Sequence, residues 1–311
     1  MTDGGRRAGP DRAEATDGYD LIFVGNVGLN VIHRFDGSTD PMVGGPVFFG
    51  ALSTTWSDKR VAVVTRMAHR DRGILEPLCE ADIDVFVSPT RETTRGHMYY
   101  LSDDVDDRRH TLETSAGPFS MTDLPPVGAR LFHLVGVNRL EFPLDFMIGV
   151  RDRGQAFTVD MQALIRRTDL RTGEVRYEDY PHKRRVAAMA AKVKLDAVEA
   201  EILTGTADLE QAALQFERWG TPEVMITRSD GVLVRHERKS YFEPFTHRWV
   251  SGRTGRGDTT FGSYLARRLD FGVPESLKFA AAAASMKLER PGFLSVTRDE
   301  VVQRMSGSRQ G

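Results

Sequence analysis

Short apolar runs alternate with helix-like stretches along most of this chain, and this alternation restricts the fold more than any other feature. The runs DLIFV from Asp20, VAVVT from Val61 and AFTVD from Ala156 have the length and apolar character of strands buried on both faces. Amphipathic segments with helical spacing lie between such runs, as at residues 209–219. The alternation predicts an α/β fold with a doubly wound, mainly parallel sheet flanked by helices, and a barrel is the alternative topology.

A different pattern begins at Thr93. Side chains alternate along TTRGHMYYL, which is typical of a half-exposed strand, and a charged turn leads from it to HTLET. We therefore predict a hairpin within a small β-sheet that stands off the main domain, with strands near residues 30–40 and 90–115. Acidic residues in the turn could bind a metal ion, although a solvated turn is the stronger interpretation. These residues are Asp103, Asp104, Asp106 and Asp107.

The charge balance restricts the partners of the protein. The 42 Lys and Arg residues against 44 Asp and Glu residues leave a net charge of −2, so no general basic surface indicates nucleic acid or an anionic membrane as a partner. The single cysteine, Cys79, cannot form an internal disulfide, which is typical of a reducing compartment. Because the sequence also has neither an apolar run as long as a membrane span nor a signal-peptide pattern, we expect a cytoplasmic protein.

The stretch VSGRTGRGDTTFGSYLARRL, from Val250, joins a glycine-rich turn to an amphipathic helix. Because Gly255 and Gly257 have no side chains, their backbone N–H groups can surround one anion, and a helix that begins near Asp258 adds the positive end of its dipole. Asp258 offers a carboxylate that can accept the proton of a hydroxyl group. An ordinary N-capped helix explains the local pattern equally well, so the rest of the chain must decide between the two.

Two further places offer groups for ligand binding. Gly44 and Gly45 allow the backbone to approach a ligand, although a simple junction with a helix opened by Pro46 is equally compatible with the sequence. Asp160 and Gln162 end a predicted parallel strand, at the edge where active sites of such sheets lie. Both places therefore agree with a cleft that faces the glycine-rich turn.

These segments, in this order, resemble the ribokinase-like (PfkB) carbohydrate kinase family. GRTGRGD, from Gly252 to Asp258, is similar to the family signature Asp-Thr-x-Gly-Ala-Gly-Asp. The resemblance implies that Asp258 is the catalytic base. The implied anion hole is formed by Gly255, Arg256 and Gly257. The chain departs from the signature where Gly252 and Arg253 replace Asp and Thr, and where Arg256 replaces a small residue.

Other segments agree with the same family. DAVEAEILTG has the spacing of its Asn-x-x-Glu segment, in which Glu199 is implied to order water around Mg²⁺ and Asp196 takes the Asn position. A loop shortened by one residue and an alanine-rich helix are similar to the family's nucleotide-binding loop and adenine-flanking helix. The implied nucleotide-binding residues are Thr227, Ser229, Gly231 and Ala283. The implied substrate-binding residues are Asn30, Gly44, Gly45 and Phe49, of which Asn30 and Phe49 differ from the usual Asp and Asn.

The resemblance covers residues 20–292 and implies an ATP-dependent phosphotransferase that moves the γ-phosphoryl group to a hydroxyl of a small sugar or sugar-like polyol. ATP and Mg²⁺ are the implied cofactors, and a monovalent cation is a further possibility. A nucleoside kinase of the same fold is the alternative, because Phe48 and Phe49 could stack a base, although they could equally belong to the core. The alternative from another class is a non-catalytic sugar-binding or regulatory protein, since the departures in the signature also fit lost activity.

The resemblance also divides the chain into three regions. We expect a disordered arm at residues 1–18, a kinase domain with its small lid sheet at 19–305, and a flexible tail at 306–311. The lid would cover the sugar. Its exposed edge suggests a homodimer formed through the lid sheet.

Overall fold

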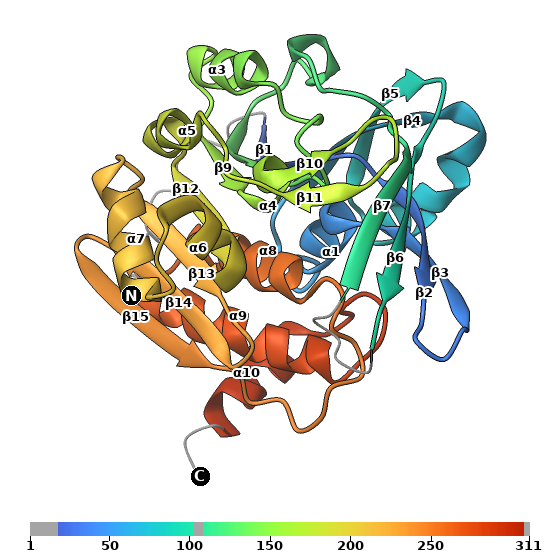
Figure 1. Ribbon diagram of the computed structural model, residues 1–311. Coiled ribbons are helices and arrows are strands. Elements are labelled where there is room, and N and C mark those ends of the chain that lie inside the picture. Colours follow the sequence, from blue (N-terminus) through green and yellow to red (C-terminus); the bar gives the residue numbers. More distant parts are fainter. Residues whose placement is uncertain (1–17, 103–107, 308–311) are drawn as a thin grey trace, which may run out of the picture.

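A nine-stranded sheet forms the centre of the computed structural model, which describes residues 18–102 and 108–307 (Figure 1). Its strand order is β15-β14-β13-β12-β9-β8-β1-β4-β5. The strands from β5 to β13 in this order are parallel, and β14 and β15 extend the sheet as an antiparallel hairpin. The strands are β1 (Tyr19–Val24), β4 (Val61–Ala68), β5 (Asp84–Thr90), β8 (Ala129–Leu134), β9 (Phe157–Asp160), β12 (Lys192–Asp196), β13 (Glu223–Thr227), β14 (Gly231–His236) and β15 (Lys239–Pro244).

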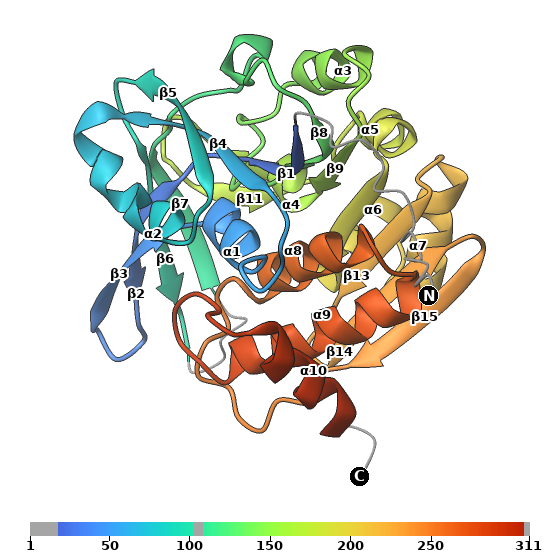
Figure 2. The ribbon, with the colours of Figure 1, turned by 180° about the vertical axis from the view of Figure 1, so that it is seen from behind.

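Helices cover both faces of this sheet (Figures 1 and 2). Side chains of β1 alternate between the two cores, with Ile22 and Val24 on one face and Leu21 and Phe23 on the other. The first face is covered by α3 (Leu144–Asp152), α5 (Lys183–Met189), α6 (Ala197–Thr204) and α7 (Leu209–Arg218). The second is covered by α1 (Pro46–Leu52), α2 (Glu76–Glu80), α8 (Arg256–Arg268) and α9 (Val273–Leu288). The doubly wound prediction is confirmed, and the linear strand order excludes the barrel.

A separate four-stranded sheet has the order β3-β2-β6-β7. Its strands are β2 (Gly28–His33), β3 (Thr39–Gly44), β6 (Thr94–Tyr100) and β7 (Arg108–Thr114). The predicted hairpin is formed by β6 and β7, which pair antiparallel, whereas β2 and β6 pair parallel across a long stretch of sequence. The acidic run at 103–107, and with it the metal alternative, lies outside the described residues.

A two-stranded ribbon that the sequence did not predict packs beside this small sheet. It consists of β10 (Arg166–Thr168) and β11 (Val175–Tyr177), and it follows the short helix α4 (Gln162–Ile165). The Leu112 N–H donates to the Gly173 carbonyl at 2.7 Å, which joins β7 to the ribbon. The ribbon therefore brings Arg166 next to the small sheet.

Three local details complete the fold. Residues 69–80 form a 3₁₀ helix at His69–Leu75 followed by α2, because Gly73 weakens the first part and Pro77 opens the second. The expected tail is helical through Gly307, because α10 (Arg298–Gly307) packs on α9 through Val301. A further 3₁₀ turn lies at Met121–Asp123. Residues 1–17 of the expected arm and 308–311 of the tail lie outside the described residues.

None of the helices in the described ranges is long and apolar enough to cross a membrane. The Cys79 thiol is free and exposed on α2.

Candidate active site

A cavity of about 170 Å³ lies between the central sheet and the small sheet. Asp196 and Thr227 contribute from the carboxyl ends of β12 and β13, whereas Asn30 and Met98 contribute from β2 and β6. Crevices at the carboxyl ends of parallel strands are where ligands bind in open α/β sheets. The cavity is therefore the candidate active site, with the small sheet forming one of its walls.

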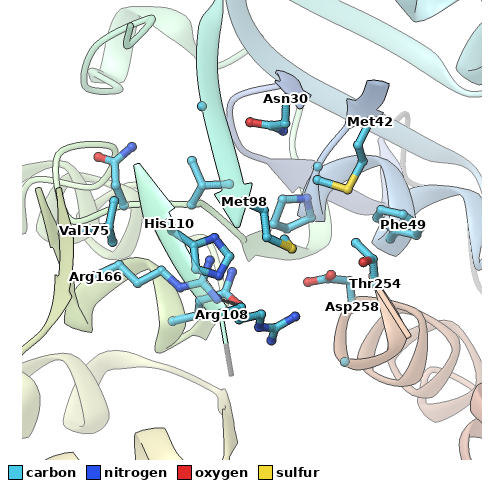
Figure 3. Close-up of a pocket in the computed structure, with 18 of the residues that line it drawn as sticks. Asn30, Met42, Phe49, Met98, Arg108, His110, Arg166, Val175, Thr254 and Asp258 are labelled. Carbon is cyan, nitrogen blue, oxygen red and sulfur yellow. Dashed lines mark hydrogen bonds between the residues drawn. The ribbon is translucent and has the colours of Figure 1, made fainter. Parts of the chain in front are cut away.

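Asp258 projects into this cavity from the first turn of α8, across from His110 and Arg166 (Figure 3). Close packing of α8 on α1 sets its position, because a Cβ at Gly262 would lie 2.4 Å from the Gly50 carbonyl oxygen. Burial raises the pKa of Asp258 to about 6, although the positive charge of Lys194 acts in the opposite direction. A carboxylate with such a pKa is suited to accept a proton near neutral pH.

The turn before α8 requires its two glycines. Gly255 is the N-cap residue with φ 80°, and a Cβ there would lie 2.1 Å from the Phe49 ring. A Cβ at Gly257 would lie 3.1 Å from the Lys194 ammonium nitrogen. Their small size lets the turn and the N-terminus of α8 approach both the cavity and this lysine, as an anion-binding turn must.

Lys194 and Asp160 form a buried ion pair beneath the turn. The Lys194 ammonium nitrogen lies 2.9 Å from Asp160 Oδ2, and both side chains are almost inaccessible to solvent. Despite burial, Asp160 and the carboxylates of Glu199 and Asp258 raise the pKa of Lys194 above its usual value, so the lysine is charged. The lysine was missed in the sequence, where the only signal was a cationic residue inside the buried strand KVKLD.

Three arginines that line the cavity lie close enough for their charges to interact: Arg108 at the start of β7, and Arg253 and Arg256 in the turn. Burial lowers the pKa of Arg256 to about 10, and the neighbouring Arg253 and Arg108 charges act in the same direction. The side chain is therefore still cationic at neutral pH, and its guanidinium carbon lies 5.5 Å from the centre of the Phe245 ring. Such a concentration of positive charge favours an anionic ligand.

Asp196 and Glu199 cap the N-terminus of α6 by reciprocal hydrogen bonds. The Asp196 N–H donates to Glu199 Oε2 at 2.7 Å, and the Glu199 N–H donates to Asp196 Oδ1 at 2.8 Å. Burial, and then the Asp196 charge, raise the pKa of Glu199 to about 8. Asp196 lines the cavity, whereas Glu199 is 3% exposed and is not among the residues that line it. One oxygen of each side chain takes no part in the cap, and hard oxygen ligands of this kind fit a hydrated Mg²⁺ ion. Within residues 18–102 and 108–307, no three acidic, His or Cys side chains form a direct metal site.

Of the predicted substrate residues, Asn30, Gly45 and Phe49 line the cavity. Gly44 does not, and a Cβ there would lie 2.8 Å from the Phe48 side chain, so the glycine is required for packing. Phe48 is buried in the core. Phe49 is only 6% exposed and packs on Phe293, with ring centres 4.8 Å apart.

The end of the cavity across from Asp258 contains His110 and Arg166 (Figure 3), and Asn138 also lines the cavity. Sequence reasoning did not identify these three residues as ligands. Buried His110 Nε2 and Arg166 Nε have no hydrogen-bond partner in the described part of the chain. Burial and the Arg166 and Arg108 charges lower the pKa of His110 to about 2, so its imidazole is neutral. Buried polar atoms are rarely unpaired, so these two nitrogens are unusual among the polar atoms around the cavity.

Gln162, noted in the sequence at the end of a strand, also lines this end and accepts a hydrogen bond from Arg166 at 2.7 Å. Glu141 lies behind the wall and accepts hydrogen bonds from the N–H groups of Asn26, Val137 and Asn138 at 3.0, 2.7 and 3.2 Å. It thereby holds together the loops that follow β1 and β8 and orients Asn138.

The predicted nucleotide residues are not brought together. Thr227 lines the cavity, and Ser229 is exposed on the next turn. Gly231 is covered by Phe242, whose ring would lie 2.5 Å from a Cβ at that glycine. Ala283 is 0% exposed, in a cluster with Val301 of α10. The helix surface assigned to adenine is thus covered by the chain itself.

Residues 178–298 match the family model described as pfkB family carbohydrate kinase. No curated protein sequence gives a significant match. Among solved structures, a pyrophosphate-dependent kinase of the ribokinase family in complex with sulfate is 28% identical to this chain. The two structures superpose with a TM-score of 0.84 over 91% of this chain and 99% of the other. A pyrophosphate-dependent kinase of that family, complexed with a pyrophosphate analogue and myo-inositol, is 26% identical with a TM-score of 0.83 and the same coverages.

The ribokinase of Arabidopsis thaliana, complexed with ribose and ATP, is 17% identical with a TM-score of 0.72, covering 93% of this chain and 99% of that one. The fold of the chain is therefore ribokinase-like. The chain is thus similar to the PfkB family of carbohydrate kinases over residues 178–298, the region that includes the glycine turn and Asp258.

The raised pKa of Asp258 predicts an acid limb in the pH profile. A base must be ionised to accept a proton, so kcat/KM should fall about tenfold for each pH unit below the pKa, which is about 6 for Asp258. Initial rates between pH 4.5 and 8 at saturating donor will measure it. If kcat/KM instead begins to fall only at about pH 4, the ordinary pKa of an exposed aspartate, the proposed burial of the base is contradicted.

Proposed function

We propose that this protein transfers a phosphoryl group from inorganic pyrophosphate to a hydroxyl group of a small polyol. We choose pyrophosphate as the donor because Arg108, Arg253 and Arg256 form a cluster beside the glycine turn. Pyrophosphate has no adenosine part through which to bind, so its affinity must come from cationic side chains and N–H groups around its oxygens. At position 256, where a small residue is usual in the family, the arginine thus serves to bind the donor.

The packing of α10 also supports a compact donor. Ala283, the residue implied to flank adenine, is covered by α10. ATP, the donor that the family resemblance implied, is therefore the alternative and needs a rearrangement of this helix.

The acceptor end favours a polyhydroxylated ring. Asn30, Asn138 and His110 offer hydrogen-bonding groups, whereas Met42, Met98 and Val175 form apolar walls for ring faces (Figure 3). myo-Inositol is the first acceptor to test, because it occupies a similar pyrophosphate-dependent kinase. A nucleoside acceptor has less support, since the Phe49 ring already packs on Phe293 and Gly255.

The proposed reaction is an in-line displacement. An acceptor hydroxyl gives its proton to Asp258 while its oxygen forms a bond to phosphorus, and the bond from phosphorus to the bridging oxygen breaks, releasing phosphate. The N–H groups of Gly255 and Gly257 and the Arg256 guanidinium stabilise the charge on the transferred oxygens. Positioning and electrostatics supply most of the rate, because the protein forms no covalent bond in this step.

Asp196 and Glu199 are the residues that would hold Mg²⁺ through water. When bound, the ion would neutralise charge on the donor oxygens. Homodimer formation through the small sheet and a cytoplasmic location stay predictions.

The donor is tested by measuring initial rates with pyrophosphate and with ATP, each with a panel of myo-inositol, ribose, fructose, adenosine and cytidine. We expect turnover with pyrophosphate and a polyol. Arg256→Ala should lower kcat/KM for pyrophosphate by about 10²- to 10³-fold, the usual effect of removing one charge-stabilising donor. Arg238→Ala, at an exposed hairpin position, is the matched control.

Preferred turnover with ATP would overturn the donor assignment and leave the kinase class intact. Ligand binding with no turnover on either donor would instead favour the non-catalytic alternative. Against that alternative, Asp258, Lys194 and the glycine turn are all in place around the cavity.

A further inference from the structure

Lys287 lies in the last turn of α9, behind the glycine turn, and its side chain is one of the most deeply buried charges of the protein. It is 1% exposed. Its ammonium donates to the carbonyl oxygens of Gly252 at 2.8 Å and Arg290 at 3.3 Å, and it lies 5.6 Å from the centre of the Phe49 ring. The proposed reaction assigns no role to this lysine.

The segment around Gly252 is shaped to receive this ammonium. The N–H groups of Ser251 and Gly252 donate to the Leu288 carbonyl at 2.8 and 3.0 Å, which fixes the segment on the C-terminal end of α9. A Cβ at Gly252 would lie 1.9 Å from the Arg290 carbonyl oxygen and 2.9 Å from the ammonium. The glycine that replaces the Asp of the family signature is therefore needed for this arrangement.

We propose that the Lys287 ammonium serves as a tethered monovalent cation that positions the phosphate-binding turn, so that phosphoryl transfer needs no free K⁺ or NH₄⁺. Carbonyl oxygens converging on one point from two loops, beside a helix C-terminus, form a site for a single positive charge. The lysine fills that site from within the chain. Lys287 is a positioning residue, because its ammonium donates to backbone carbonyl oxygens and the side chain is not among those that line the candidate active site.

The positioning follows from peptide geometry. In a planar trans peptide the carbonyl and the next N–H point in opposite directions, so holding the Gly252 oxygen also orients the Arg253 N–H. The Arg256 N–H then donates to the Arg253 carbonyl at 3.1 Å, where α8 begins, two residues before Asp258. The cation is thus linked through one short turn to the catalytic base.

The charge state agrees with this role. Burial lowers the pKa of Lys287 to about 8, while the Asp258 charge acts in the opposite direction, so the ammonium form prevails at neutral pH. The carboxylate of Asp258 also gains a nearby compensating charge.

The test compares wild type and Lys287→Ala in KCl, NH₄Cl and choline chloride at equal ionic strength. The wild type should give the same rate in all three salts. Lys287→Ala should lose about 10²-fold in choline chloride, the effect of a misplacement of about 1 Å. It should regain most of that loss in KCl or NH₄Cl, which can enter the vacated site. Lys239→Ala, at an exposed strand position, should behave as wild type.

Thermal unfolding gives a second readout that does not depend on activity. The melting temperature of Lys287→Ala should rise in KCl relative to choline chloride, whereas that of the wild type should not. A wild type that requires K⁺, a variant that is fully active in choline chloride, or a variant that no cation restores would each overturn the proposal. If Lys287→Ala does not fold, the proposal is tested by the rates of the wild type and of Lys287→Met in the same three salts.

The role of Lys287 rests on the proposed phosphoryl transfer at this site, and it does not depend on which donor supplies the phosphoryl group. Rates are therefore compared between salts on whichever donor supports turnover. A switch from pyrophosphate to ATP would change the proposed function and leave the salt ratios as the test of Lys287.

Discussion

Asp258→Asn is expected to lower kcat by about 10³-fold while the protein stays folded, because an amide of the same shape cannot accept the hydroxyl proton. The side chain projects into the cavity from the N-terminus of α8, and its burial and pKa are those of a general base. Single-turnover phosphoryl transfer measured on both donors will give the effect on the chemical step.

The binding of donor and acceptor should change much less than kcat in this variant, since the anion turn and the acceptor end are untouched. Asp299→Asn, in the exposed first turn of α10, is the matched control. Turnover of Asp258→Asn within about tenfold of wild type would remove Asp258 from the role of base, because general bases contribute about 10²- to 10⁴-fold.

Lys194→Met should cause a large loss of stability. It leaves the Asp160 carboxylate buried without its partner, and breaking a buried ion pair in this way costs about 3–5 kcal/mol. Urea unfolding of wild type, Lys194→Met and the double variant Lys194→Met/Asp160→Asn will measure it. The double variant should recover most of the stability, because no unpaired charge is left in the interior.

Donor binding separates the structural role of Lys194 from its role in the site. The ammonium lies beside Gly257 in the anion turn, so the double variant should still bind the donor weakly although it is stable. Because the Lys194 charge lowers the pKa of Asp258, the single variant Lys194→Met should also shift the acid limb of the pH profile to higher pH. In the double variant the loss of the Asp160 charge, which raises that pKa, opposes the shift. Recovery of wild-type donor affinity in the double variant would show that Lys194 serves stability alone.

The order of strands and helices could be predicted because their signals are local. The run VAVVT became part of β4 and the run AFTVD became β9, since continuous apolar character is a property of neighbouring residues. The irregular elements were missed where the local signal is weak. The ribbon of β10 and β11 is held by pairing with β7, which no short window of sequence contains.

By itself the sequence determined the alternating α/β architecture and the glycine turn with Asp258, because both depend on residue types a few positions apart. Only the tertiary structure decided what surrounds that turn. Lys194 meets Asp160 across two parallel strands, and Lys287 reaches Gly252 from the end of another helix. Each pair is separated by more than thirty residues. A buried charge needs its partner in space, and sequence spacing does not record which distant residue the fold will supply.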